Sequence, residues 1–267
     1  MEIIVIKVGG SVLNQLHPSF YSTCKRLIEK GTFPVIVHGG GNEITNWMKK
    51  MGKEPQFIQG RRVTDEESLK IVTSVLGGEI NKRFVSVFSQ SGVQAIGLSG
   101  IDLQMFSVEP IHPSLGYVGK VVHVNCLPVT RLLEQGWIPV IASLGVDQQG
   151  QVFNVNADDA AVALAQAIKA EKVLMVSDVD GVLDENGNVL AKIGSKEVQR
   201  LIDSGTITAG MIPKVRSGIE GLKGSVDEII ILNGTKPWSE NIKQMKGTYL
   251  VKEGVDSDVA VSKLSAL

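Results

Sequence analysis

Two glycine-rich loops constrain the fold of this chain more than any other feature, because each directly follows an apolar, β-branched run. The first run, residues 3–6, leads into KVGGS at 7–11, and the second, residues 34–37, leads into HGGG at 38–41. Uninterrupted apolar runs of this length are typical of strands buried on both faces. A helical pattern follows each loop, so we expect parallel strand–helix–strand units in one sheet that is covered on both faces.

The rest of the chain continues this alternation of strands and helices. Further strands are predicted at 95–98, 138–141, 172–176 and 228–232, with an edge strand at 248–251. Helices are predicted at 79–91, 128–135, 160–170 and 238–246, and Asn42 is a suitable N-cap for the helix after the second loop. A short extended or hairpin segment is expected at 57–64, and a hairpin at 105–124. The pattern as a whole predicts an α/β fold.

The two glycine loops each allow two interpretations. Glycine is the default turn residue, so both loops could be simple turns. However, backbone N–H groups at the start of a helix form a natural phosphate site, and a triple glycine lets them point into one concavity. Two such loops at neighbouring strand ends favour phosphate binding. His38 lacks an acidic or hydroxyl neighbour in sequence, which favours a role in shaping the turn over a role as general base.

Three charged motifs lie outside the glycine loops. The run NVNADD at 154–159 precedes a predicted helix, where it is either an N-cap or a means of orienting lysines through Asp158. Lys214 lies in the first turn of another predicted helix, where the helix dipole opposes a cation, so an anionic partner is favoured. Arg61 and Arg62 form a pair that is either solvated surface or a clamp for an acidic substrate.

Composition limits the possible partners. The 267 residues carry 27 Lys and Arg against 28 Asp and Glu, which excludes a global electrostatic grip on nucleic acid or an anionic membrane. No apolar run approaches the length of a membrane span. Cys24 and Cys126 lack CxxC spacing, so free thiols are expected and no zinc site. Because the first strand follows Met1 without a leader-like segment, we expect a cytoplasmic protein.

Six motifs in sequence order resemble the amino acid kinase family over nearly the whole chain. They are KVGG at 7–10, HGGG at 38–41, GRRVT at 60–64, NVNAD at 154–158, SDVDG at 177–181 and GMIPK at 210–214. The resemblance implies a three-layer αβα sandwich with a central, mostly parallel sheet. It also implies an amino-acyl substrate-binding half at 1–170 and an ATP-binding half at 171–267, which share one continuous sheet.

The resemblance further implies a reaction and a set of roles. The reaction is ATP-dependent phosphorylation of the γ-carboxylate of N-acetyl-L-glutamate to N-acetyl-L-glutamyl 5-phosphate, a step of arginine biosynthesis. Lys7 and Lys214 would contact the phosphates from opposite sides while Asp158 holds both lysines. The acceptor side would comprise Gly10, Gly40, Gly41, Arg62 and Asn154. The nucleotide side would comprise Ser177, Asp178, Gly181, Gly210 and Met211. Mg²⁺ would be held mainly by the ATP phosphates.

These residue types suit phosphoryl transfer to a carboxylate, which needs positioned cations and N–H groups but no protein nucleophile. Rival functions are a kinase of the same fold for aspartate, glutamate, carbamate, carrier-bound aminoadipate or a nucleoside monophosphate, and a non-catalytic nucleotide sensor. A dinucleotide-dependent oxidoreductase is disfavoured because GxGxxG does not follow the first strand, and GxxxxGK[ST] does not occur either.

Two features limit the resemblance. Ala209 stands where the last motif often carries Asp or Gly, which leaves the shape of the ATP-side loop open. Family members that arginine inhibits have an additional helix before the first strand, and none precedes residue 3 here. We therefore expect an arginine-insensitive homodimer.

Overall fold

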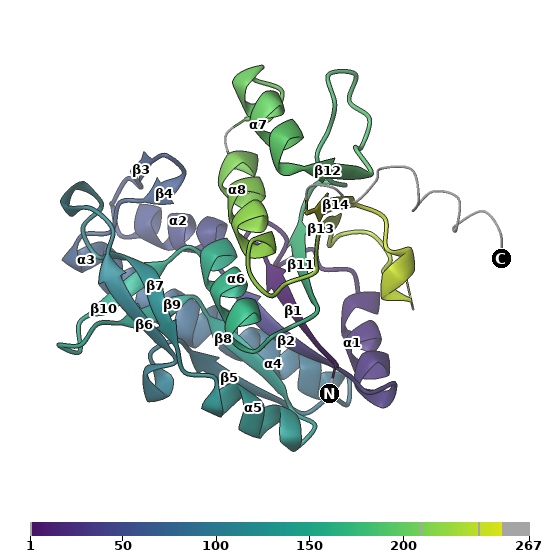
Figure 1. The fold of residues 1–267 in the computed structure, drawn as a ribbon. Helices are drawn as coiled ribbons and strands as arrows, with labels where there is room; N and C mark the ends of the chain where they lie inside the picture. The colour runs from purple at the N-terminus through teal and green to yellow at the C-terminus, as the bar shows by residue number, and fades with distance from the viewer. Residues whose placement is uncertain (1, 209, 240, 253–267) are drawn as a thin grey trace, which may run out of the picture.

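The central strand β1 (Glu2–Val8) lies in the middle of an eight-stranded sheet in the computed structural model, which describes residues 2–208, 210–239 and 241–252 (Figure 1). The sheet order is β12 (Lys192–Gly194), β14 (Thr248–Val251), β13 (Glu228–Asn233), β11 (Lys172–Ser177), β1, β2 (Thr32–His38), β8 (Ile138–Ala142) and β5 (Ala95–Ser99). All neighbours are parallel except β13 and β14. The predicted mostly parallel sheet is confirmed.

Helices cover both faces of this sheet. One face packs against α1 (Ser19–Glu29), α2 (Gly41–Lys50), α3 (Glu66–Thr73) and α4 (Asn81–Gln90), with the π-helical segment η1 (Ser74–Ile80) joining the last two. The other face packs against α5 (Leu127–Glu134), α6 (Ala157–Ala167), α7 (Ser195–Asp203) and α8 (Met211–Leu222). The three-layer αβα sandwich is therefore confirmed (Figure 1). No helix in the described part of the chain has both the length and the apolar character needed to cross a membrane.

The alternation of side chains along β1 determines where its lysine lies. Ile4, Ile6 and Val8 are fully buried on the face of α1 to α4. Val5 points to the opposite face, among buried residues of α6 and α8. Since side chains two residues apart share a face, Lys7 extends to the side of α6 and α8. A lysine at the carboxyl end of a central strand is thereby brought to the N-terminal turns of two helices.

A small four-stranded barrel stands beside the sheet. It consists of β6 (Phe106–Pro110), β7 (Val118–Val124), β9 (Leu144–Val146) and β10 (Val152–Val155). The hairpin expected at 105–124 is confirmed as β6 and β7, and the short extended or hairpin segment expected at 57–64 is the hairpin of β3 (Phe57–Ile58) and β4 (Arg61–Arg62). The strand β10 leads directly into α6, so the barrel fixes where that helix starts.

Several predicted boundaries were wrong. The strand 248–251 is not at the edge, because the three-residue β12 pairs outside it. Residues 238–246 contain only a 3₁₀ turn, η4 (Ile242–Gln244), in their described part. The N-cap of α2 is Gly40 and not Asn42. The helix predicted at 160–170 starts at Ala157 and its last residue is Ala167, because Asn156 caps it. The departure at Ala209 lies outside the described residues.

Candidate functional site

Asp158 joins two lysines from different parts of the chain. Lys7 Nζ lies 2.9 Å from Asp158 Oδ1, and Lys214 Nζ lies 3.3 Å from the same oxygen. β1 contributes Lys7, the first turn of α6 contributes Asp158, and the first turn of α8 contributes Lys214. All three residues are at most 7% exposed. The two lysines and the aspartate proposed as catalytic are thus brought together in one buried cluster.

Burial and mutual attraction set the charges of this cluster. Burial raises the pKa of Asp158, but the ammonium groups of Lys214 and Lys7 outweigh it and lower that pKa to about 2. Burial lowers the pKa of Lys7 to about 8 in spite of the attraction of Asp158. With two cations and one anion, the cluster has a net positive charge inside the protein. A buried excess of one charge is unfavourable unless it is paired, so the cluster favours an anionic ligand.

Three helices start at this cluster. The N-caps of α2, α6 and α8 are Gly40, Asn156 and Gly210. Asn156 accepts hydrogen bonds from the backbone N–H groups of Asp158 and Asp159 at 2.8 and 3.1 Å. Asn156 thus performs the capping, which leaves the carboxylate of Asp158 for the lysines. Neither α2 nor α8 has a side-chain cap, so their first N–H groups can bind an anion.

The two glycine loops are in contact, and their lack of side chains makes this possible. A Cβ atom on Gly10 would lie 2.3 Å from the backbone nitrogen of Gly41. A Cβ atom on Gly40 would lie 2.5 Å from Ile80 Cδ1. Backbone N–H groups of both loops therefore surround the same space beside Lys7. If the two loops were simple, independent turns, as the sequence also allowed, this close approach would have no explanation.

A pocket of about 180 Å³ opens beside the cluster. Its lining includes all the residues predicted for the acceptor side, Gly10, Gly40, Gly41, Arg62 and Asn154, together with Lys7 and Asp158. The lining also includes Phe57, Ile44, Leu76 and Val118, which provide apolar walls. A charged end and an apolar wall together suit a small organic acid.

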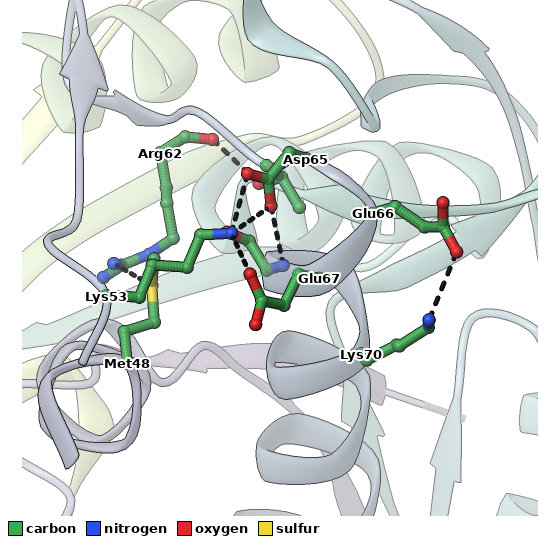
Figure 2. A network of polar contacts seen from close by, with 9 residues as sticks. Met48, Lys53, Arg62, Asp65, Glu66, Glu67 and Lys70 are labelled. Carbon is green, nitrogen blue, oxygen red and sulfur yellow. Dashed lines mark hydrogen bonds and ion pairs between the residues drawn. The ribbon is translucent and has the colours of Figure 1, made fainter. Parts of the chain in front are cut away.

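Arg62 is held in place from several sides, and Figure 2 shows its contact with Met48. Its Nη2 donates to Gly41 O and to Thr45 Oγ1, each at 2.8 Å, and its Nη1 contacts the sulfur of Met48. Its guanidinium also lies 4.7 Å from the ring centroid of Phe57. Burial lowers the pKa of Arg62 to about 10, which still leaves it charged at neutral pH. It is a rigid cation in the pocket wall.

Thr64 connects Arg62 to the barrel. Thr64 Oγ1 donates to the carbonyl of Arg62 at 2.9 Å and accepts from Asn154 Nδ2 at 3.1 Å. Further out, Lys53 binds both Asp65 and Glu67, and Asp65 caps α3 through Ser68 N (Figure 2). The hydrogen bonds to Lys53 lower the pKa of Asp65 to about 2. The two predicted acceptor residues on β4 and β10 thus belong to one connected network.

The residues predicted for the nucleotide lie around the carboxyl end of β11 and the start of α8. Ser177 is the last residue of β11, and its hydroxyl donates to the exposed Asp178 at 3.2 Å. Gly210 caps α8 and Met211 is its first residue. Gly181 has φ +154°, and a Cβ there would lie 2.5 Å from Thr248 Oγ1, so packing alone requires glycine at this position. Contact of these residues with a nucleotide remains a prediction.

Some residues of the site were not foreseen from sequence. Arg61, Phe57 and Ser143 also line the pocket. Arg61 was recognised only as one member of an arginine pair, and Ser143 follows β8 without any motif. Asp159 binds Arg61 at 2.7 Å. The only sequence indication for Asp159 was its place directly after Asp158 in a helix N-terminal run.

The arrangement brings a buried cationic cluster, two glycine loops and open helix N-termini to the carboxyl ends of the central strands, next to an arginine-lined pocket. Such a site can hold two anions close together and neutralise charge between them. The model of the amino acid kinase family matches residues 2–233, which include every element of the site. The chain belongs to the amino acid kinase family.

Individual members of this family and related folds are similar over almost the whole chain. An acetylglutamate kinase of Geobacillus sp. (strain WCH70) is 42% identical over 253 residues, which cover 94% of this chain and 98% of that protein. The crystal structure of smu.665 from Streptococcus mutans UA159 is 36% identical, with a TM-score of 0.85 over 93% of this chain and 98% of that chain.

A third similarity concerns the fold alone. The N-acetylglutamate synthase of Neisseria gonorrhoeae, solved with coenzyme A and N-acetyl-glutamate, has a TM-score of 0.83 at 24% identity. The similarity covers 94% of this chain and 60% of the synthase. The amino acid kinase fold therefore also occurs within a longer enzyme with a different name, so the reaction must be argued from the site.

Proposed function

We propose that this protein transfers the γ-phosphoryl group of ATP to the γ-carboxylate of N-acetyl-L-glutamate, giving N-acetyl-L-glutamyl 5-phosphate in arginine biosynthesis. The buried Lys7–Asp158–Lys214 cluster beside an arginine-lined pocket carries this proposal. The similar Geobacillus protein, named an acetylglutamate kinase, supports the choice of acceptor. The rival sensor function is disfavoured because a passive nucleotide site does not need two lysines on one buried carboxylate.

The cluster performs the chemical work. Lys7 and Lys214 approach the transferring phosphoryl group from two sides and neutralise the charge on its equatorial oxygens, while Asp158 keeps both ammonium groups in place. The N–H groups of Gly10, Gly40 and Gly41 bind the phosphoryl group and the attacking carboxylate. No general base is required, since the acceptor carboxylate is already ionised at neutral pH. We therefore assign no role as general base to His38. This residue is fully buried, and burial lowers its pKa to about 4.

The pocket selects the acceptor by charge. Arg62 and Asn154 hold the part of the acceptor that does not react. Free glutamate carries an ammonium group, which would enter a pocket lined by Lys7, Arg61 and Arg62. Acetylation removes this positive charge, so the pocket discriminates against the free amino acid by repulsion.

The nucleotide is assigned to the other half of the sheet. ATP contacts Ser177, Asp178, Gly181, Gly210 and Met211 in the half at 171–267, and the acceptor occupies the half at 1–170. The described residues contain no group of three or more His, Cys, Asp or Glu side chains suited to a metal ion, and the lysines occupy Asp158. Because Mg²⁺ usually takes few protein ligands, it is assigned to the phosphate oxygens of ATP, where it would supply further positive charge.

Trapping of the acyl phosphate tests this function. Hydroxylamine converts an acyl phosphate into a hydroxamate, so the purified protein is incubated with ATP, Mg²⁺ and hydroxylamine plus N-acetylglutamate, glutamate or aspartate. We expect hydroxamate with N-acetylglutamate and a preference of at least about 100-fold over the other two, because placing like charges together costs several kcal/mol. No product from N-acetylglutamate, or equal rates with glutamate, would overturn the assignment.

A further inference from the structure

Asp159 repeats, one residue along the chain, the bridging arrangement of Asp158. Its Oδ2 accepts from Arg61 Nη2 at 2.7 Å, and its Oδ1 accepts from Ser217 Oγ at 2.5 Å. Both oxygens of the carboxylate are thus used, each by a partner from a different element. Arg61 belongs to the hairpin of β3 and β4, and Ser217 belongs to α8. Two adjacent carboxylates at the start of α6 therefore each join the N-terminal part of the chain to α8.

The hairpin and α8 also touch directly. Gly60 has φ +77°, and a Cβ on it would lie 2.9 Å from Pro213 Cγ. Pro213 directly precedes Lys214, and Ser217 lies three residues after Lys214, one turn further along the helix. The hairpin is therefore docked onto the same turn of α8 that presents the lysine to the phosphate site.

Arg61 connects this contact to the acceptor pocket. Its side chain lines the pocket together with that of Arg62. The side chains of Arg61 and Asp159 are 30% and 28% exposed, so water screens the ion pair only in part. A second hydrogen bond from Ser217 removes the rotational freedom that would otherwise weaken such a pair. Ser217 itself is not among the residues that line the pocket.

We infer that Asp159 and Ser217 are positioning residues that couple the acceptor hairpin to the donor-side helix. This inference rests on the proposed function. α8 carries Lys214. Through Asp159, the position of this helix determines how Arg61 and its hairpin are placed relative to the acceptor. Coupling of this kind is reciprocal, so a bound nucleotide that fixes α8 also strengthens binding of the acceptor.

Ser217→Ala tests the coupling, because the Ser217 hydroxyl donates to Asp159 and Ser217 does not line the pocket. We expect the KM for the acceptor to rise about fivefold to tenfold, as for loss of one typical intramolecular hydrogen bond, with kcat within about twofold. Ser217→Thr, which keeps the hydroxyl, should restore the KM. Ser225→Ala is the matched control, since Ser225 Oγ donates to Gln166 O and connects the loop after α8 to the far end of α6.

A double-mutant cycle with Arg61→Ala identifies the path. If Ser217 and Arg61 both act through Asp159, the variant that carries Ser217→Ala and Arg61→Ala should have an acceptor KM no higher than that of Arg61→Ala alone. Calorimetry should also show that a non-hydrolysable ATP analogue tightens acceptor binding to the wild type severalfold more than to Ser217→Ala. The inference would be overturned if Ser217→Ala had the same acceptor KM as Ser225→Ala. It would also be overturned by additive effects in the cycle, or by equal tightening of acceptor binding in the wild type and in Ser217→Ala.

The acceptor in these experiments is the compound that the wild-type protein phosphorylates. A failure of the proposed function would therefore appear in the acceptor profile of the wild type. A failure of the coupling would appear only in the comparison of Ser217→Ala with its control.

Discussion

At the scale of single residues, the site depends on one carboxylate that stays ionised between two ammonium groups. Asp158 has a pKa of about 2, so its carboxylate remains ionised at neutral pH. Lys7 is the member that can lose its proton near physiological pH, because burial lowers its pKa to about 8. The positive charge of the site therefore depends on pH through Lys7.

The pH profile should report this titration. The lysine acts as a cation, and its charge is present below its pKa and lost as the pH rises through it. We predict that kcat/KM for ATP is constant between pH 6.5 and 7.5 and falls above about pH 8. Initial rates with saturating acceptor measure the profile, and a value that stays flat up to pH 10 would contradict the assigned role of Lys7.

Arg62 allows a prediction about binding. A cation that holds the non-reacting part of the acceptor contributes equally to ground state and transition state, so its loss should raise KM and not lower kcat. For Arg62→Ala we predict an acceptor KM raised about 10- to 100-fold, the range expected for lost charged hydrogen bonds, with kcat within about threefold.

The control for Arg62→Ala is Lys53→Ala, which removes a cation paired to Asp65 and Glu67 outside the pocket. Its acceptor KM should equal that of the wild type. A change confined to the KM for ATP in Arg62→Ala would assign the residue to the nucleotide instead.

At the scale of elements, the contact between the two glycine loops determines where the backbone donors point. A Cβ at position 10 would overlap the nitrogen of Gly41, so the loops would have to separate. We predict that Gly10→Ala lowers the free energy of unfolding by about 1–3 kcal/mol, as overpacking does, and abolishes most of the activity.

Denaturant unfolding, together with the turnover rate, checks this prediction. Gly41→Ala is the control for stability, since a Cβ at that position meets no atom within 4 Å and Gly41 is the first residue of α2. Its stability should match that of the wild type. Equal stability of both variants would show that the two loops are not in contact.

The elements also show what could be predicted from sequence. Apolar runs such as residues 3–6 identify strands because a strand buried on both faces needs no polar residue. The start of α6 was placed three residues too late, because Asn156 and Asp159 are equally good caps in sequence and only the strand β10 decides between them. The strand β12 was missed because three residues carry no periodicity.

The candidate site was predictable where a residue type is unusual for its local structure. Lys214 in a first helical turn and Lys7 at the end of a buried strand are examples. Contacts such as those of Arg61 with Asp159 and of Asp159 with Ser217 join residues 98 and 58 positions apart, and no local pattern reports them. Long-range pairs of this kind had to come from the structure.

At the scale of the whole molecule, one sheet underlies both proposed substrate sites, and one of its outer strands suggests how copies associate. Within the described residues, β12 and β5 are the two outer strands; β5 pairs only with β8, and its residues are half-buried. Unpaired edges are rarely left free. We predict a homodimer, so light scattering after gel filtration should give twice the mass of the 267-residue chain. The mass of a single chain would contradict this.

In the proposed reaction, two lysines on one buried carboxylate stabilise the phosphoryl group during its transfer, and Lys214→Ala tests this role most directly. The control is Lys223→Ala, an exposed lysine at the other end of α8 that pairs with Glu220. With both substrates saturating, we predict that kcat of Lys214→Ala falls at least about 100-fold, as for loss of one oxyanion-stabilising group, while both KM values change less than about threefold. A kcat equal to that of Lys223→Ala would contradict the account.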